Sequence, residues 1–346
     1  MKKISVAVLG ATGTVGQKFI TLLDGHPLFD VAELVASPRS AGKAYRDAAN
    51  WKQPQPIPAT IADKTVKSLD QKLESPVLFS GLDASVAGEA ETRFAEAGHM
   101  VISNSRNHRM DPNVPIIIPE VNPDHFKILD TQPTTGKIVT NSNCSTMFLA
   151  MALAPLHRKY GLTKVQVTTL QAVSGGGYPG VPSLDILGNV VPYISGEEEK
   201  IEIEAVKILG SCDGKSLTPA DFTVSAQCTR VPVIDGHTET VAFGLAANPS
   251  IEEVAETLRS FTGIPQEKQL PSAPRQPIIV TDEPDRPQPA RDILLENGMA
   301  TIVGRLRTCP IMGYKMVIMG HNTVRGAAGA AILNAETLHA LGYIQA

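Results

Sequence analysis

A cysteine, an arginine and a histidine stand in contexts that suit nucleophilic chemistry on a small acid. Cys144 lies in the segment NSNCST, between a strand pattern and a helix pattern. A thiol at a helix N-terminus has a lowered pKa, so it reacts more readily as a thiolate. Arg230 and His237 are the first and last residues of the segment RVPVIDGH, which we interpret as a hairpin-like turn with Asp235 and Gly236 at its bend. The arginine suits a substrate carboxylate and the histidine suits proton transfer. A histidine here would on its own be a surface or packing residue, but with the thiol it makes Cys–His catalysis plausible.

Two further segments carry charges that suit an amino acid or an anion. If GEEEKIEIE is helical, Glu197, Lys200 and Glu204 fall at i, i+3 and i+7 on one face. A carboxylate there suits an ammonium group and the lysine suits an anion, although such a face is usually only solvated charge. The segment SNSRNHR places Arg106 and Asn107 after a predicted strand. Its arginines could bind phosphate or lie in a solvated loop.

The start of the chain predicts a dinucleotide site. A strand pattern runs into GATGTVG, which supplies the candidate cofactor-binding residues Gly10, Thr12, Gly13, Thr14, Val15 and Gly16. Glycines let the backbone approach a pyrophosphate, whose charge the following helix N-terminus accepts. The second strand ends at SPRSAG, without the acid that usually holds the ribose 2′-hydroxyl of NAD. Ser37, Arg39 and Ser40 could hold a 2′-phosphate instead, so NADP is favoured, unless Arg39 is a solvated loop residue. In QAVSGGGYPG, Ser174 and Gly175 follow a strand, where glycines permit close approach of a ligand or form a flexible crossover loop.

The element pattern indicates two domains of different class. In the first part, strands expected at 4–10, 31–37, 76–81 and 99–104 alternate with helical patterns at 17–23 and 89–97. Such alternation predicts an α/β Rossmann-type domain with a parallel sheet. After a strand at 137–144 and a helix at 145–159, β-rich runs follow at 164–173, 222–230, 238–245, 300–307 and 314–319. They predict an α+β domain with a mostly antiparallel sheet. We expect an NADP-binding domain at 1–143, a catalytic domain at 144–324 and a C-terminal helix at 325–346 that returns to the first domain.

Composition and charge exclude several classes of protein. The chain has 346 residues, 42% of them hydrophobic and 19% charged, which is typical of a globular protein of about two domains. A net charge of -4 provides no basic field for nucleic acid, and no apolar run is long enough to span a membrane. None of the four cysteines lies in a CxxC or CxxH spacing, so neither a metal site nor a disulfide framework is predicted. Free thiols fit a reducing cytoplasm, and Cys212, Cys228 and Cys309 are interpreted as small buried hydrophobes.

Together these segments resemble the aspartate-semialdehyde dehydrogenase family, in the branch with an RVPVxDGH segment. The resemblance covers nearly the whole chain and rests on GATGTVG, SPRSAG, SNSRNHRM, NSNCST, QAVSGGGYPG, GEEEK, RVPVIDGHT and HNTVRGAAGAA, in the family order. It implies that Cys144 is the nucleophile, that His237 is the general acid/base, and that Gln171 orients an acyl intermediate. It further implies Arg230 for the substrate carboxylate, Glu197 and Lys200 for substrate and phosphate, Arg106 and Asn107 for phosphate, and Asn322 near the nicotinamide. Glu204 faces the same way as Glu197 and is included as a candidate substrate residue.

The resemblance implies an NADP-dependent reaction on a small-molecule substrate. The enzyme would interconvert L-aspartate 4-semialdehyde plus phosphate and 4-phospho-L-aspartate through a cysteine thioester. It would serve lysine, threonine and methionine biosynthesis, as a homodimer or homotetramer. Malonyl-CoA reductase is the nearest alternative, and N-acetyl-glutamyl-phosphate reductase and glyceraldehyde-phosphate dehydrogenase share the chemistry but have other cysteine contexts. A non-catalytic NADP-binding sensor would not need Cys144 and His237 together, and the dinucleotide loop disfavours a papain-like hydrolase.

Overall fold

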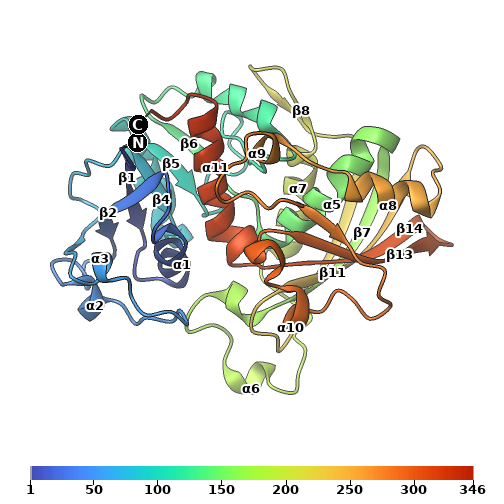
Figure 1. The fold of residues 1–346 in the computed structure, drawn as a ribbon, viewed down its shortest axis with the longest axis horizontal. Helices are drawn as coiled ribbons and strands as arrows, with labels where there is room; N and C mark the ends of the chain where they lie inside the picture. The colour runs from blue at the N-terminus through green and yellow to red at the C-terminus, as the bar shows by residue number, and fades with distance from the viewer. Residues whose placement is uncertain (1, 346) are drawn as a thin grey trace.

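The first part of the chain folds around a parallel sheet, as its alternating patterns predict. In the computed structural model, which describes residues 2–345, six strands lie in the order β3-β2-β1-β4-β5-β6 and pair in parallel (Figure 1). They are β1 (Ile4–Leu9), β2 (Phe29–Val35), β3 (Val66–Lys67), β4 (Val77–Ser80), β5 (Met100–Ser103) and β6 (Lys137–Thr140). Every residue of β4 and β5 is buried, as expected for strands in a sheet covered on both faces.

Helices cover both faces of this sheet, and the alternation along β1 shows how. Val6 and Val8 pack in one core with α1 (Thr14–Leu23) and with the C-terminal helix α11 (Gly329–Ala340). Ala7 and Leu9 point the other way and pack with α4 (Ala84–Glu96). Helix α11, drawn in red, lies between the two sheets and contacts β4 and β5 of the first (Figure 1). The end of the chain therefore packs against its beginning.

The second sheet is mixed, which corrects part of the sequence prediction. Its order is β10-β7-β11-β14-β13-β12, and the β10–β7 and β12–β13 pairings are parallel while the three central pairings are antiparallel. The strands are β7 (Leu162–Gln171), β10 (Thr223–Arg230), β11 (His237–Leu245), β12 (Ile278–Val280), β13 (Thr301–Cys309) and β14 (Gly313–Gly320). Crossover connections, which local strand patterns do not reveal, bring the outer strands in as parallel neighbours.

The segment RVPVIDGH is not a hairpin, because β7 lies between β10 and β11. Its connection instead crosses the end of β7, where the Val231 N–H donates to the Gln171 carbonyl at 3.0 Å. Arg230 pairs with Gln171 in register, and Thr238 pairs with Leu170 on the other side. The crossing therefore sets Arg230, Gln171 and His237 side by side at one end of the sheet.

Helix α5 (Cys144–Tyr160) is the central element of the second core. It packs on one face of the mixed sheet together with α7 (Glu197–Ile208) and α8 (Ile251–Arg259). Every residue from Ser145 to Leu156 is buried, so this helix is enclosed on all sides rather than amphipathic. Its N-terminus follows β6 of the first sheet, so the first residue of α5 lies where the two domains meet.

The remaining elements are short and belong to connecting segments. They are α2 (Tyr45–Ala48), α3 (Ala59–Ala62), α6 (Ser183–Ile186), α9 (Ile264–Glu267), α10 (Pro289–Asp292), the β8 (Ser211–Cys212) and β9 (Leu217–Thr218) pair, the 3-10 turns η1 (Pro123–Thr131), η2 (Val173–Gly176) and η3 (Leu295–Gly298), and a π-helical turn η4 (Val324–Ala328). The segment with α6 projects away from the body of the molecule (Figure 1). Within residues 2–345, no helix has the length and apolar character needed to cross a membrane.

Candidate active site

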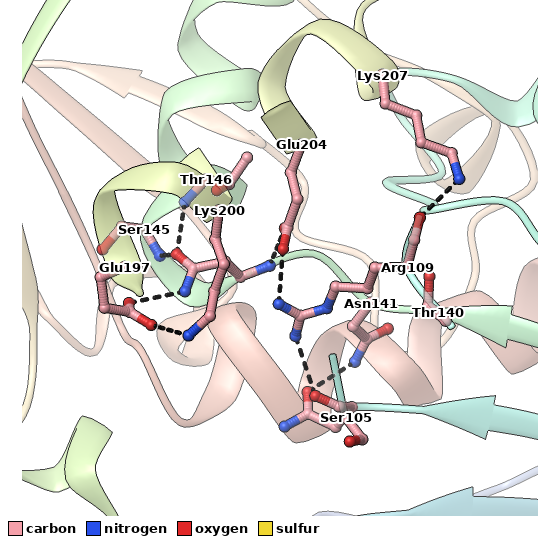
Figure 2. Close-up of polar contacts among 12 residues, drawn as sticks. Ser105, Arg109, Thr140, Asn141, Ser145, Thr146, Glu197, Lys200, Glu204 and Lys207 are labelled. Carbon is pink, nitrogen blue, oxygen red and sulfur yellow. Dashed lines mark hydrogen bonds and ion pairs between the residues drawn. The ribbon is translucent and has the colours of Figure 1, made fainter. Parts of the chain in front are cut away.

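Cys144 is the first residue of α5, on an elbow that its neighbour fixes. Asn143 is the N-cap, and its Oδ1 accepts hydrogen bonds from the Ser145 N–H at 2.9 Å and the Thr146 N–H at 3.2 Å (Figure 2). Such a cap satisfies backbone donors that have no partner in the first helical turn. The NSNCST segment thus ends a strand, caps a helix and presents the thiol in three consecutive steps.

The thiol faces a histidine whose orientation is set by the backbone. Cys144 Sγ lies 3.1 Å from His237 Nε2, and the His237 ring is fully buried. The Ala172 N–H donates to Nδ1 at 3.1 Å. Since Nδ1 accepts this bond, the neutral ring carries its proton on Nε2 and donates it towards sulfur.

Burial makes both groups neutral in the ligand-free protein. It lowers the pKa of His237 to about 3, and the nearby Arg230 charge lowers it further. It raises the pKa of the Cys144 thiol to about 12, with the negative charge of Glu197 adding to the effect. The sequence prediction of a lowered thiol pKa was therefore wrong for this state, because desolvation outweighs the helix N-terminus.

Glu197 is the centre of a polar network beside the thiol. Its carboxylate accepts hydrogen bonds from Lys200 Nζ at 2.5 Å and Asn143 Nδ2 at 2.8 Å (Figure 2). It also accepts one from Gln171 Nε2 at 3.1 Å. Burial opposes the charge on Glu197, but Lys200 and the two amides outweigh it and leave the pKa below its usual value. Gln171 also donates to Ser145 Oγ at 2.9 Å, so the first turn of α5 is tied to β7.

Two further predicted residues, Arg230 and Asn322, are held by the segment that follows β7 and by the connection between β10 and β11. The Arg230 guanidinium donates to the Ala172 carbonyl at 2.7 Å, so Ala172 orients both Arg230 and His237. Asn322 donates to Ser174 Oγ at 2.8 Å and accepts from the Gly236 N–H at 2.8 Å. These bonds leave the ends of both side chains at the edge of the cleft.

A cleft of about 450 Å³ brings most of the predicted residues together. It is lined by Arg106, Cys144, Gln171, Ser174, Gly175, Glu197, Lys200, Arg230 and Asn322, with His237 directly beneath Cys144. Arg109, the second arginine of SNSRNHR, also lines it, as does Gly326, to which the sequence analysis assigned no role. A Cβ on Gly326 would lie 2.9 Å from Cys144 Cβ, so the glycine of HNTVRG is the signal that its π-helical turn approaches the nucleophile closely.

Two predicted residues lie outside this cleft in the described part of the chain. Asn107 is exposed, and its amide donates to the Ala84 carbonyl at 3.0 Å. Glu204 is 2% exposed, and its carboxylate accepts from Arg109 at 2.8 Å and from the Asn143 N–H at 2.6 Å. Neither side chain is presented to a molecule in the cleft, so their predicted contacts with phosphate and substrate do not fit their positions.

A second cleft, of about 600 Å³, fits a dinucleotide. It is lined by Gly10, Thr12, Gly13, Thr14, Val15 and Ser37, and within residues 2–345 no side chain caps the N-terminus of α1. Free N–H groups at a helix N-terminus suit a pyrophosphate. Arg39 and Ser40 are not among its lining residues in the described structure, nor is Gly16, which supports the turn through its contact with Gly10; Lys52 and Tyr178 line the cleft instead. Lys52 Nζ lies 4.5 Å from the centre of the Tyr178 ring.

The two clefts share one end. Thr14, Val15, Gly176 and Gly177 line both of them. A dinucleotide bound at the glycine turn can therefore extend to the thiol. Within residues 2–345 no group of three or more His, Cys, Asp or Glu side chains is arranged to hold a metal ion.

Comparison with known proteins agrees with this geometry over the whole chain. Residues 5–129 match the family model "Semialdehyde dehydrogenase, NAD binding domain" and residues 153–325 match "Semialdehyde dehydrogenase, dimerisation domain". The chain is 48% identical to an aspartate-semialdehyde dehydrogenase of Methanothermobacter thermautotrophicus, covering 97% of this chain and 99% of that one. It is 49% identical to one of Schizosaccharomyces pombe, covering 96% of each. A crystal structure of the Candida albicans aspartate semialdehyde dehydrogenase with NADP superimposes with a TM-score of 0.92 at 45% identity, covering 99% of this chain and 100% of that one.

Proposed function

The chain belongs to the aspartate-semialdehyde dehydrogenase family, and from that premise we propose which of its residues carry the reaction. It is an NADP-dependent oxidoreductase that interconverts L-aspartate 4-semialdehyde plus phosphate and 4-phospho-L-aspartate. We assign the nucleophile to Cys144, hydrogen-bond donation to His237 and orientation of the acyl group to Gln171. The observation that carries this assignment is the 3.1 Å contact between Cys144 Sγ and His237 Nε2, at the wall of the cleft that adjoins the dinucleotide cleft.

The charged residues of the cleft are assigned to the ends of the substrate. Arg230 presents a planar guanidinium, which suits the α-carboxylate. Glu197 remains ionised because its pKa is held low, which suits the ammonium group. Lys200 and Arg106 are the further cations we assign to phosphate, and Arg109 is a third cation on the same wall.

In the oxidative direction, the Cys144 thiol gives up its proton to solvent, because His237 Nε2 already carries one, and the resulting thiolate attacks the aldehyde carbon. The C–S bond forms and the carbonyl electron pair moves to oxygen, so negative charge passes from sulfur to oxygen. His237 Nε2–H, which points at sulfur in the free protein, lies within reach of both atoms and stabilises the charge at each. NADP supplies the hydride acceptor. When hydride leaves, the oxyanion closes to a carbonyl and the acyl group stays on Cys144 as a thioester.

Phosphate then attacks the thioester and releases the thiolate. A phosphate oxygen forms the new C–O bond, the C–S bond breaks, and the electron pair returns to Cys144. The Nε2–H of His237 again faces the charged sulfur. Gln171 donates its two amide N–H groups to Ser145 Oγ and to Glu197, so it fixes the wall of the cleft beside the thiol, along which the acyl group is oriented.

The test is formation of NADPH with aspartate semialdehyde and phosphate, followed by absorbance. We expect activity that requires both compounds, loss of that activity in Cys144→Ser, and no NADPH oxidation with malonyl-CoA. A Cys144→Ser protein with full activity would contradict the assignment of Cys144 as the nucleophile. Activity with malonyl-CoA alone would contradict the substrate.

We also propose a homodimer or homotetramer in the cytoplasm. The dimerisation-domain match covers the mixed sheet, whose face opposite α5 carries Gln166, Thr168, Thr240 and Lys315 around a shallow hollow. A second copy on this face would cover it, and light scattering of the purified protein measures the assembly.

We divide the chain into an NADP-binding domain at 1–143, a catalytic domain at 144–324 and a returning helix at 325–346. The packing of α11 on the first sheet supports this division.

A further inference from the structure

Glu204 holds the backbone of the residue that precedes the nucleophile. Its Oε2 accepts the Asn143 N–H at 2.6 Å, although 61 residues separate the two in sequence. We propose that Glu204 is a positioning residue for Cys144, which sets where the thiol stands relative to His237. The inference rests on the proposed role of Cys144 as the nucleophile. It goes beyond that role because Glu204 lines neither cleft and makes no contact with the thiol.

Helix α7 grips Asn143 at two points. Glu197 and Glu204 lie two helical turns apart and so on one face of α7. Glu197 accepts from the side-chain amide of Asn143 at 2.8 Å, and Glu204 accepts from its backbone N–H. The third polar group of Asn143, Oδ1, caps α5. The residue before the thiol is therefore fixed by its main chain and its side chain together, as Figure 2 shows around Glu197 and Glu204.

The carboxylate that grips Asn143 is itself immobilised. Its other oxygen accepts from Arg109 at 2.8 Å, and Arg109 also donates to the Asn104 carbonyl at 3.0 Å. Lys207, one turn further along α7, donates to the Arg109 carbonyl at 2.6 Å (Figure 2). Both Glu204 and Arg109 are buried, so this ion pair is screened little by water. The contact with Asn143 therefore starts from a rigid support.

Loss of this acceptor acts on geometry and not on substrate binding. The Asn143 N–H would be left buried without a partner, and the turn from β6 into α5 would relax to satisfy it. Any shift is passed directly to Cys144, whose Sγ must stay in contact with His237 Nε2. A displacement of about 1 Å at a reacting atom lowers the rate by roughly 100-fold.

Two substitutions separate reach from charge. Glu204→Gln keeps the length of the side chain, but its NH₂ group must face either Arg109 or the Asn143 N–H, both of which are donors. Glu204→Asp keeps the charge beside Arg109 and withdraws the oxygen from Asn143 by one methylene. We expect kcat to fall by roughly 10- to 100-fold in both variants, while KM for aspartate semialdehyde and the affinity for NADP stay close to those of the wild type. Glu199→Gln, an exposed carboxylate on the same helix, is the matched control and should keep wild-type kcat.

The outcomes distinguish the alternatives. If only Glu204→Gln is impaired and Glu204→Asp keeps wild-type kcat, the carboxylate merely neutralises Arg109 and the proposal is overturned. Unchanged kcat in both variants overturns it as well, and a large rise in KM would make Glu204 a binding residue. Melting curves and circular dichroism of each variant establish that it is folded, so an unfolded fraction is not mistaken for lost positioning. Failure of the proposed function appears separately, as absent activity in the wild type.

Discussion

Two adjacent glycines offer a sharp test of the arrangement around His237. A Cβ on Gly175 would lie 2.9 Å from Arg230 NH1, 3.0 Å from His237 Cε1 and 3.1 Å from His237 Nε2. A Cβ on Gly176 would meet no atom within 4 Å among the described residues. Gly175→Ala and Gly176→Ala therefore add the same methyl group one residue apart. The first methyl group meets Arg230 and His237, and the second enters open space.

The expected size of the effect follows from these contacts. Carbon atoms pack at about 3.5 Å or more, so the new methyl must push its neighbours away by roughly 0.5 Å. Arg230 is fixed by its bond to Ala172, and the His237 ring is fully enclosed, so neither moves freely. A shift of this size at Nε2 stretches its contact with Cys144 Sγ. We expect kcat to fall by roughly 10- to 100-fold, which is about 1.4 to 2.7 kcal/mol in the activation barrier.

Steady-state kinetics of the two variants, with melting curves to confirm folding, provide the measurement. Gly175→Ala should lose kcat, and it should also raise KM for aspartate semialdehyde if Arg230 holds the carboxylate. Gly176→Ala should keep kcat, and any effect should fall on the KM of NADP. Equal kcat values for the two folded variants would refute the view that the 173–176 turn packs directly on the catalytic pair.

Three further predictions concern single groups. In the free protein, iodoacetamide should modify Cys309 before Cys144, because hydrogen bonds from backbone N–H groups lower the pKa of Cys309. The rate of Cys144 alkylation should rise about tenfold per pH unit through the neutral range, and a plateau below a pH of about 9 would contradict the raised pKa of Cys144. Glu239 is fully buried, neither carboxylate oxygen finds a partner among residues 2–345, and burial raises its pKa well above 4.5. Folding must then bind a proton. Once the pH exceeds the pKa of the unfolded carboxyl, the free energy of unfolding therefore falls by about 1.4 kcal/mol for each pH unit. Glu239→Gln should melt at a higher temperature than the wild type, by a margin that grows with pH, and a constant margin would contradict this prediction. Lys52→Ala should weaken NADP binding, because it removes a positive charge from the dinucleotide cleft; the fluorescence of the adjacent Trp51 measures the affinity, and an unchanged affinity would show that Lys52 does not contribute to cofactor binding.

Local signals in the sequence were sufficient for the two ends of the site. GATGTVG and NSNCST each follow a strand and lead into a helix, as their residue types and spacing predict, and the proposed pyrophosphate and thiol sites both depend on that local arrangement. The pattern of burial along β1 and β4 likewise follows from their apolar runs. These features depend on interactions within a few residues, which is why single-sequence reasoning reaches them.

The features that were missed depend on residues distant in the chain. The insertion of β7 between β10 and β11 turns a predicted hairpin into a crossing, and this crossing brings Arg230 and His237 onto either side of Gln171. The role of Glu204 requires a contact across 61 residues. Lys52 lines the dinucleotide cleft together with Ser37 and Pro38 of the SPRSAG loop, although it comes from a separate segment of the chain. Periodicity cannot reveal such partners, because it carries no information on which faces meet.

The sign of the thiol pKa shift is the most instructive of these differences. A helix N-terminus stabilises a thiolate, and the sequence reasoning stopped there. The fold adds burial and a nearby carboxylate, Glu197, and these reverse the sign. Arg109 and Arg230 act in the opposite direction but do not overcome burial in the free protein. Cys144 lines the cleft in which substrate and phosphate are proposed to bind, so added positive charge there lowers the pKa of the thiol, whereas exclusion of water raises it further. The pKa of Cys144, and with it the reactivity of the thiol, is therefore conditional on what the cleft contains.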